Sequence, residues 1–128
     1  MSILIKSARI VNDDGTRSAD ILIENGIVSR IGDGLTADGA AVIDAAGKCV
    51  FPGFIDMHAH FRTPGREDKE TIETGSRSAV KGGFTTVMCM PNTDPAIDTY
   101  EVAASVRREA ERLGLLDLIP IGAFTRGR

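Results

Sequence analysis

The chain has 128 residues, of which 42% are hydrophobic and 26% charged, and its formal net charge is −3. This composition is typical of a soluble globular protein, and the negative charge, the absence of tryptophan and the single tyrosine argue against a nucleic-acid partner. No apolar run reaches the length of a membrane span. We therefore expect no nucleic-acid and no membrane partner. Cys49 and Cys89 lack disulfide-rich or C-x-x-C spacing, which predicts reduced core thiols and a cytoplasmic protein.

The first fifty residues have the pattern of short strands separated by turns. The predicted strands cover residues 3–11, 20–24, 27–31 and 42–44, and residues 49–51 enter the strand that follows. Asn25-Gly26 is a strong two-residue hairpin signal, because both turn positions accept positive φ. A sheet of this size needs another layer to cover one of its faces.

Residues 54–61 predict a buried strand that ends in polar groups, with Pro-Gly pairs at 52–53 and 64–65 as its limits. Side chains alternate between the two faces of a strand. One face therefore carries four polar side chains if the strand stays extended. These residues are Asp56, His58, His60 and Arg62.

His58 and His60 are candidate metal ligands. Their backbones lie roughly 7 Å apart on an extended strand, which lets the rings converge on one ion, and neutral imidazole suits zinc, iron, nickel and copper. The alternative is a pair of solvated or hydrogen-bonded histidines. The two are the only histidines of the chain and lie beside Arg62, which favours the metal. The site is incomplete, since catalytic zinc takes three protein ligands and a water.

After residue 65 the periodicity becomes helical. The charged run 66–70 predicts a helix start, with an apolar stripe on one face and a stop at Gly82-Gly83. The stripe contains Ile72, Ser76, Ala79 and Val80. Residues 84–90 then form a continuous apolar run that is typical of a buried strand.

A second helix is predicted to follow the loop at residues 91–95. Asp98 or Thr99 is its expected cap, and Glu101 is a possible partner in a capping box. Its apolar face contains Val102, Val106, Ala110 and Leu113, and Gly114 ends it. Residues 118–125 predict a third strand, although Pro120 argues against a central position in a sheet.

This alternation of strands and helices predicts a parallel sheet with helices outside it. In such folds the chemistry lies at the carboxyl ends of the strands. His58, His60 and Arg62 lie at the end of the first parallel strand, and Asn92 follows the second. We expect these groups to meet, although Asn92 considered alone is better explained by a hydrogen bond within its own loop than by ligand binding.

The chain resembles the amino-terminal part of an enzyme of the amidohydrolase superfamily, and is most similar to dihydroorotases of the long bacterial type. The resemblance is carried by Pro-Gly-Phe-Ile-Asp-Met-His-Ala-His-Phe-Arg-Thr-Pro-Gly at residues 52–65 and by residues 69–75, 82–87, 90–93 and 120–123. These segments span nearly the whole chain in the expected order. One departure is Thr63, where the family usually has glutamate in H-x-R-E-P-G.

The resemblance implies an α/β fold, the amino-terminal part of a TIM-type (β/α)8 barrel preceded by strands of a small β-sandwich domain. Residues 1–50 would supply the sandwich strands, and residues 51–128 the first three strands and two helices of the barrel. A barrel typically needs about 250 residues. The chain would therefore be a fragment that is inactive by itself.

The implied reaction is the reversible cyclisation of N-carbamoyl-L-aspartate to dihydroorotate in pyrimidine biosynthesis. The resemblance makes His58 and His60 ligands of one or two zinc ions, and makes Arg62 and Asn92 substrate-binding residues. Asp56 is a candidate for orienting a ligand, with a structural role as the alternative. The remaining ligands and the catalytic aspartate would lie beyond these residues. Possible partners are further copies of the chain or aspartate transcarbamoylase.

Two alternatives stay open at this point. One is a related cyclic-amide hydrolase such as an allantoinase or hydantoinase, although Met90 in the sequence Met-Pro-Asn-Thr favours dihydroorotase. The other is a non-catalytic homologue or fragment that acts in assembly.

Overall fold

The computed structural model describes residues 1–127, which form two compact units. The first unit is Met1–Pro52 and the second begins at Gly53. None of the helices within residues 1–127 is long and apolar enough to cross a membrane.

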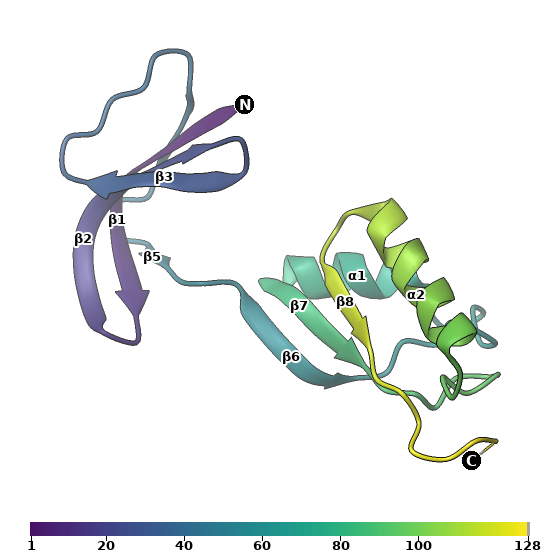
Figure 1. The fold of residues 1–128 in the computed structure, drawn as a ribbon. Helices are drawn as coiled ribbons and strands as arrows, with labels where there is room; N and C mark the ends of the chain where they lie inside the picture. The colour runs from purple at the N-terminus through teal and green to yellow at the C-terminus, as the bar shows by residue number, and fades with distance from the viewer. Residues whose placement is uncertain (128) are drawn as a thin grey trace. The chain divides into compact units, whose positions relative to one another are not determined.

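The first unit is a five-stranded sheet, as the all-β pattern predicts (Figure 1). Its strands are β1 (Ser2–Asn12), β2 (Gly15–Glu24), β3 (Ile27–Gly32), β4 (Ala41–Asp44) and β5 (Cys49–Val50). The order is β3-β2-β1-β4, and β5 also pairs with β1. The hairpins β1–β2 and β2–β3 are antiparallel, whereas β4 and β5 run parallel to β1.

The hairpin predicted at Asn25-Gly26 is confirmed, with φ values of 53° and 79° at the two positions. β2 begins earlier than the sequence predicts, at Gly15 instead of Asp20. The polar residues between these positions pair with the second half of β1. Backbone pairing therefore extends the strand where the side chains carry no apolar signal.

A buried carboxylate stabilises an irregularity in β1. The register of β1 against β2 shifts between Ile5 and Ala8, and Ser7 has a positive φ of 57°. The Asp20 side chain, 5% exposed, accepts hydrogen bonds from the backbone N–H groups of Ser7 at 2.8 Å and Leu35 at 3.0 Å. It also accepts one from the Lys6 ammonium. Asp20 thus satisfies the donor that the bulge takes out of the ladder.

The second unit is a three-stranded parallel sheet with two helices, which confirms the predicted βαβαβ order. Its elements are β6 (Phe54–Ala59), α1 (Ile72–Lys81), β7 (Phe84–Cys89), α2 (Tyr100–Leu113) and β8 (Asp117–Pro120). The strand order is β6-β7-β8. β8 is shorter than predicted and ends at Pro120, at the edge of the sheet among the described residues.

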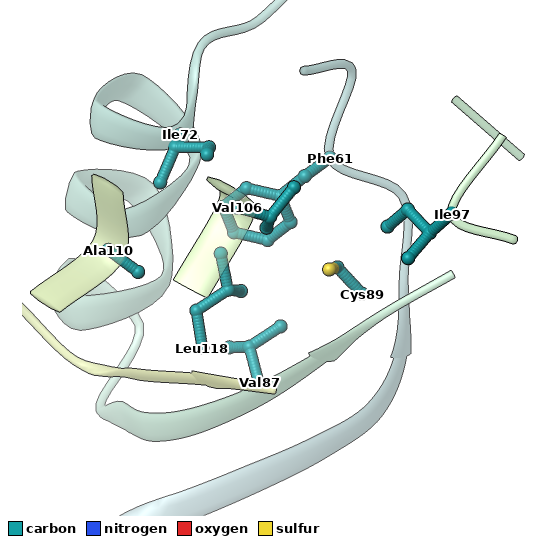
Figure 2. Close-up of a cluster of buried hydrophobic side chains, with 8 residues drawn as sticks. All are labelled: Phe61, Ile72, Val87, Cys89, Ile97, Val106, Ala110 and Leu118. Carbon is teal, nitrogen blue, oxygen red and sulfur yellow. The ribbon is translucent and has the colours of Figure 1, made fainter. Parts of the chain in front are cut away.

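One hydrophobic cluster joins both helices to the sheet (Figure 2). Ile72 comes from α1, Val106 and Ala110 from α2, and Val87 and Leu118 from the strands. Both helices therefore pack on the same face of the sheet. Val106 and Ala110 confirm the predicted apolar face of α2, whereas Val80 of α1 is 44% exposed and does not belong to the cluster.

The prediction that residues 66–70 open a helix is wrong, because α1 begins at Ile72. Thr71 caps the helix, and the Thr71 and Thr74 hydroxyls accept hydrogen bonds from each other's backbone N–H, at 3.1 Å and 2.9 Å. This reciprocal capping satisfies the first free donors of the helix. The carboxylate of Glu67 in the charged run instead accepts from the N–H of Gly65 at 3.0 Å.

α2 is capped by Thr99, whose hydroxyl accepts from the Val102 N–H at 3.4 Å. The capping box proposed for Glu101 is wrong, because the reciprocal partner must occupy the third helical position and Val102 is there. Gly114 ends the helix in the left-handed conformation, as predicted, with φ 60°.

Candidate metal centre

β6 does not keep a regular alternation of faces. Asp56 lies opposite Val87 and Ala59 lies opposite Cys89, so a step of three residues on β6 matches a step of two on β7. This is a β-bulge. It puts Asp56 and Ala59 in register with two residues that face the hydrophobic cluster.

The bulge therefore breaks the regular alternation on which Asp56 was expected to share a face with both imidazoles. Asp56, Ala59 and His60 all border a cavity of about 330 Å³ beside α1. The Asp56 carboxylate accepts a hydrogen bond from the His58 backbone N–H at 2.9 Å. In the part of the chain that the structure describes, Asp56 makes no hydrogen bond to an imidazole ring. It holds the bulged backbone next to the candidate ligands.

His58 and His60 lie close together at the carboxyl end of β6. Their ring centroids are 5.2 Å apart and the ring planes cross at 61°. Both side chains are exposed. The H-x-H spacing brings the two rings into edge-to-face contact, and imidazole nitrogens are suitable ligands for an ion that arrives from solvent.

Asn92 from the next loop contacts one of these rings. Its Oδ1 lies 2.9 Å from His60 Nδ1. The parallel pairing of β6 and β7 brings the two residues together. Ala59 precedes His60, and its carbonyl accepts a hydrogen bond from the N–H of Met90, two residues before Asn92, at 2.8 Å. A hydrogen bond within this loop is made by the next residue, Thr93. Thr93 is buried, and its hydroxyl donates to the Pro95 carbonyl at 2.7 Å.

Arg62 follows His60 and is half-buried. Its backbone carbonyl accepts from the Arg66 N–H at 2.9 Å. Within residues 1–127 its guanidinium makes no hydrogen bond or ion pair with another side chain. An arginine without an internal partner among these residues is suited to bind a planar anion through two parallel hydrogen bonds.

The loops after β6 and β7 are fastened to each other by their backbones. The Asp94 N–H donates to the Pro64 carbonyl at 3.0 Å. Gly65 has a φ of 102° and lies against the backbone of Asp94. The sequence marks Pro64-Gly65 only as the end of a strand. Its role in holding the two site-bearing loops together becomes visible in three dimensions.

The donor set fits part of a zinc site. Within residues 1–127 no group of three or more histidine, cysteine, aspartate or glutamate side chains is close enough to hold a metal ion. Cys89 does not add a ligand, because its side chain is 2% exposed and packs inside the hydrophobic cluster. The residues therefore fit zinc as two of its ligands.

Comparison with known proteins identifies the family. Residues 47–125 match the family described as dihydro-orotase-like. The chain is 51% identical over 128 residues to the dihydroorotase of Caldanaerobacter subterraneus subsp. tengcongensis, covering 99% of this chain and 30% of the relative. It is 47% identical over 130 residues to the dihydroorotase of Geobacter sulfurreducens, with 99% and 31% covered. The chain thus spans about a third of the length of these relatives.

Solved structures with a similar arrangement include hydantoinases. The L-hydantoinase of Arthrobacter aurescens superposes with a TM-score of 0.87 at 33% identity, over 98% of this chain and 28% of that one. The D-hydantoinase of a Thermus species gives a TM-score of 0.68 at 34% identity, over 92% and 26%.

Proposed function

The chain belongs to the dihydro-orotase-like family, and from that premise we propose that it is the amino-terminal part of a zinc-dependent dihydroorotase. The proposed reaction closes N-carbamoyl-L-aspartate to dihydroorotate, with one C–N bond formed and one water released, and runs in both directions. It would belong to pyrimidine biosynthesis in the cytoplasm. Residues 1–50 would contribute to a β-sandwich, and residues 51–128 would begin a TIM-type barrel.

The observation that carries this proposal is the cluster at the ends of β6 and β7. Two imidazoles lie 5.2 Å apart, and the Asn92 side chain of the neighbouring loop contacts one of them. His58 and His60 would hold the zinc, which supplies Lewis-acid chemistry at a carbonyl and activates water. The family relationship supports this assignment, and the donor types agree with it.

The residues beside the imidazoles would bind and orient the substrate. N-carbamoyl-aspartate carries two carboxylates. The half-buried Arg62 guanidinium would hold one of them by two hydrogen bonds, with the Asn92 amide as a further donor. Binding at a fixed place beside the ligands would bring the reacting groups together and lower the entropic barrier to ring closure.

Residues outside this chain would complete the centre. We propose that they supply further histidine ligands, a carboxylate or carbamylated lysine that bridges two ions, and a catalytic aspartate. Association with further copies of the chain or with aspartate transcarbamoylase belongs to the same proposal.

A hydantoinase is the second candidate, because the L-hydantoinase of Arthrobacter aurescens superposes with a TM-score of 0.87. Sequence identity favours dihydroorotase, with 51% to the Caldanaerobacter enzyme against 33% to this hydantoinase. A non-catalytic role in assembly is the third, and it would leave the imidazole pair without a metal.

A chimera tests the proposal. Residues 1–128 replace the matching part of the Caldanaerobacter dihydroorotase, and the chimera is assayed with N-carbamoyl-L-aspartate and with a hydantoin. We expect zinc-dependent turnover of the first substrate, and none by residues 1–128 alone. A folded, zinc-loaded chimera that prefers the hydantoin would contradict dihydroorotase. A folded chimera without zinc would contradict the metal centre.

Calorimetry of residues 1–128 with Zn²⁺ provides a separate test of the ligand count. Two imidazoles without a third protein ligand should bind zinc weakly, and His58→Ala should remove the binding. Nanomolar affinity would show that the chain completes a site, for example between two copies.

A further inference from the structure

The contact between His60 and Asn92 has a consequence for the tautomer of the imidazole. His60 Nδ1 and Asn92 Oδ1 are 2.9 Å apart. An amide oxygen only accepts hydrogen bonds, so the proton between the two atoms must belong to the imidazole. A neutral imidazole with a proton on Nδ1 carries its free electron pair on Nε2.

The same contact uses only one end of the asparagine side chain. Asn92 Oδ1 accepts from His60, and the Nδ2 group keeps two N–H donors for other partners. The side chain is exposed at the end of β7, in the loop that the Asp94–Pro64 hydrogen bond holds against the loop after β6. One residue can therefore fix a ring with its oxygen and offer hydrogen to an anion with its nitrogen.

We propose that Asn92 is a positioning residue for His60, in addition to its expected contact with substrate. Its Oδ1 holds His60 in the Nδ1–H tautomer and presents Nε2 as the metal-binding atom. The metal part of this proposal rests on the proposed function, whereas the tautomer does not. Partners that bind the outer nitrogen of a ligating histidine commonly fix its tautomer and orientation.

The two histidines differ in this respect. His58 has its backbone N–H bound by Asp56, and within the described residues its ring makes no hydrogen bond to a side chain. Of the two rings, the His60 ring is held by a side chain from another element, namely Asn92 in the loop after β7. The proposal therefore predicts a defined tautomer for His60 in particular.

Nitrogen NMR of residues 1–128 with ¹⁵N-labelled histidine tests the tautomer directly. The chain has two histidines, so only two rings appear, and His58→Gln leaves His60 alone for assignment. At about pH 9, where imidazole is neutral, the wild type should show a protonated Nδ1 and an unprotonated Nε2 at His60. Asn92→Ala should lose this preference, and Asn92→Asp, which keeps an oxygen acceptor, should retain it.

Titration with Zn²⁺ tests the consequence. Asn92→Ala should weaken binding about tenfold relative to the wild type, as removal of such a partner does in other metal sites, and Asn92→Asp should not. Asn12→Ala, an asparagine change in the first unit, is the control and should alter neither reading. Backbone amide spectra of each variant confirm that the second unit remains folded.

Three results would overturn the proposal. The first is an unprotonated Nδ1 at His60 in the wild type. The second is an unchanged tautomer in Asn92→Ala. The third is an Asn92→Ala variant that has lost the tautomer preference but binds zinc with unchanged affinity. A wild-type chain that has the Nδ1–H form but binds no zinc would overturn the proposed metal centre instead, and the tautomer assignment would stand.

Discussion

Gly65 and Asp94, from the two loops at the carboxyl ends of β6 and β7, are in direct contact through their backbones. A Cβ atom placed on Gly65 would lie 2.0 Å from the Asp94 carbonyl oxygen. The Asp94 N–H donates to the Pro64 carbonyl at 3.0 Å on the same side of the contact. Only glycine fits here, and its small size sets the separation between the loop that carries Arg62 and the loop that carries Asn92.

Gly65→Ala should destabilise the second unit. The backbone conformation at φ 102° alone costs about 1–3 kcal/mol for a residue with a Cβ, and the clash with Asp94 adds to this. Gly114→Ala is a matched control. Gly114 also has a positive φ of 60°, but a Cβ atom added there would lie 3.9 Å from the nearest atom, which is an ordinary contact. Denaturant unfolding should show the larger loss for Gly65→Ala. Equal losses would mean that the loop contact contributes nothing.

Gly75→Ala should destabilise α1, although alanine in a helix interior is ordinarily about 1 kcal/mol better than glycine. The new Cβ would lie 2.7 Å from the ring of Phe61, which is 4% exposed. Overpacking of this kind costs about 1–3 kcal/mol. Ser78→Ala on the exposed side of α1 should be neutral or stabilising. Combining Gly75→Ala with Phe61→Leu should recover part of the loss, and an additive double variant would argue against the contact.

Asp20 should make the first unit less stable in acid. The hydrogen bond from the Lys6 ammonium, together with the backbone donor at Ser7, lowers the pKa of the Asp20 carboxyl. A carboxyl with a lowered pKa in the folded state stabilises the fold above its ordinary pKa of about 4, and this contribution is lost as pH falls through the folded value. Asp20→Asn should lower Tm at pH 7, and the difference from wild type should shrink below about pH 4.

The measurement for Asp20 is thermal unfolding followed from pH 7 to pH 3. Asp38→Asn is the control, since Asp38 is exposed and should leave the profile unchanged. A difference between wild type and Asp20→Asn that stays constant over this range would show that the charge of Asp20 is not what stabilises the bulge.

Arg62 should govern recognition of the substrate carboxylate in the chimera. A charge-assisted hydrogen bond contributes roughly 1.5–3 kcal/mol, so Arg62→Ala should reduce kcat/KM for N-carbamoyl-L-aspartate about ten- to a hundred-fold. Arg62→Lys should also be damaging, because a point charge does not reproduce two parallel hydrogen bonds. Zinc content should hardly change. If Arg62→Ala slows an analogue without that carboxylate equally, or removes the metal, then Arg62 is structural.

The sequence predicts the parts of this fold that depend on local patterns. The Asn25-Gly26 hairpin, the strand–helix alternation after residue 52 and the helix end at Gly114 all follow from turn chemistry and hydrophobic periodicity. The start of α1 does not, because the charged run before it resembles a first turn. The reciprocal bonds of Thr71 and Thr74 decide where the helix begins.

At the candidate site, spacing alone indicates that His58 and His60 converge. It does not reveal the bulge between Asp56 and Ala59, because a bulge depends on pairing with β7. The His60–Asn92 hydrogen bond also depends on tertiary structure, although the order of the parallel strands places both residues at the same edge. The close contact of Gly65 cannot be predicted from the sequence either, because its partner Asp94 lies in another loop.

The β2–β3 hairpin and the β6–β7 pair can form on different timescales as the chain leaves the ribosome. β2 and β3 are joined by two residues, Asn25 and Gly26, and a hairpin closes in about 1–10 μs. β6 instead pairs with β7 across α1, with Phe54 opposite Phe84. At about 5–20 residues per second, β6 waits on the order of seconds for its partner. During that interval Ile55 and Met57, which are 64% and 70% exposed within the described residues, are open to chaperones.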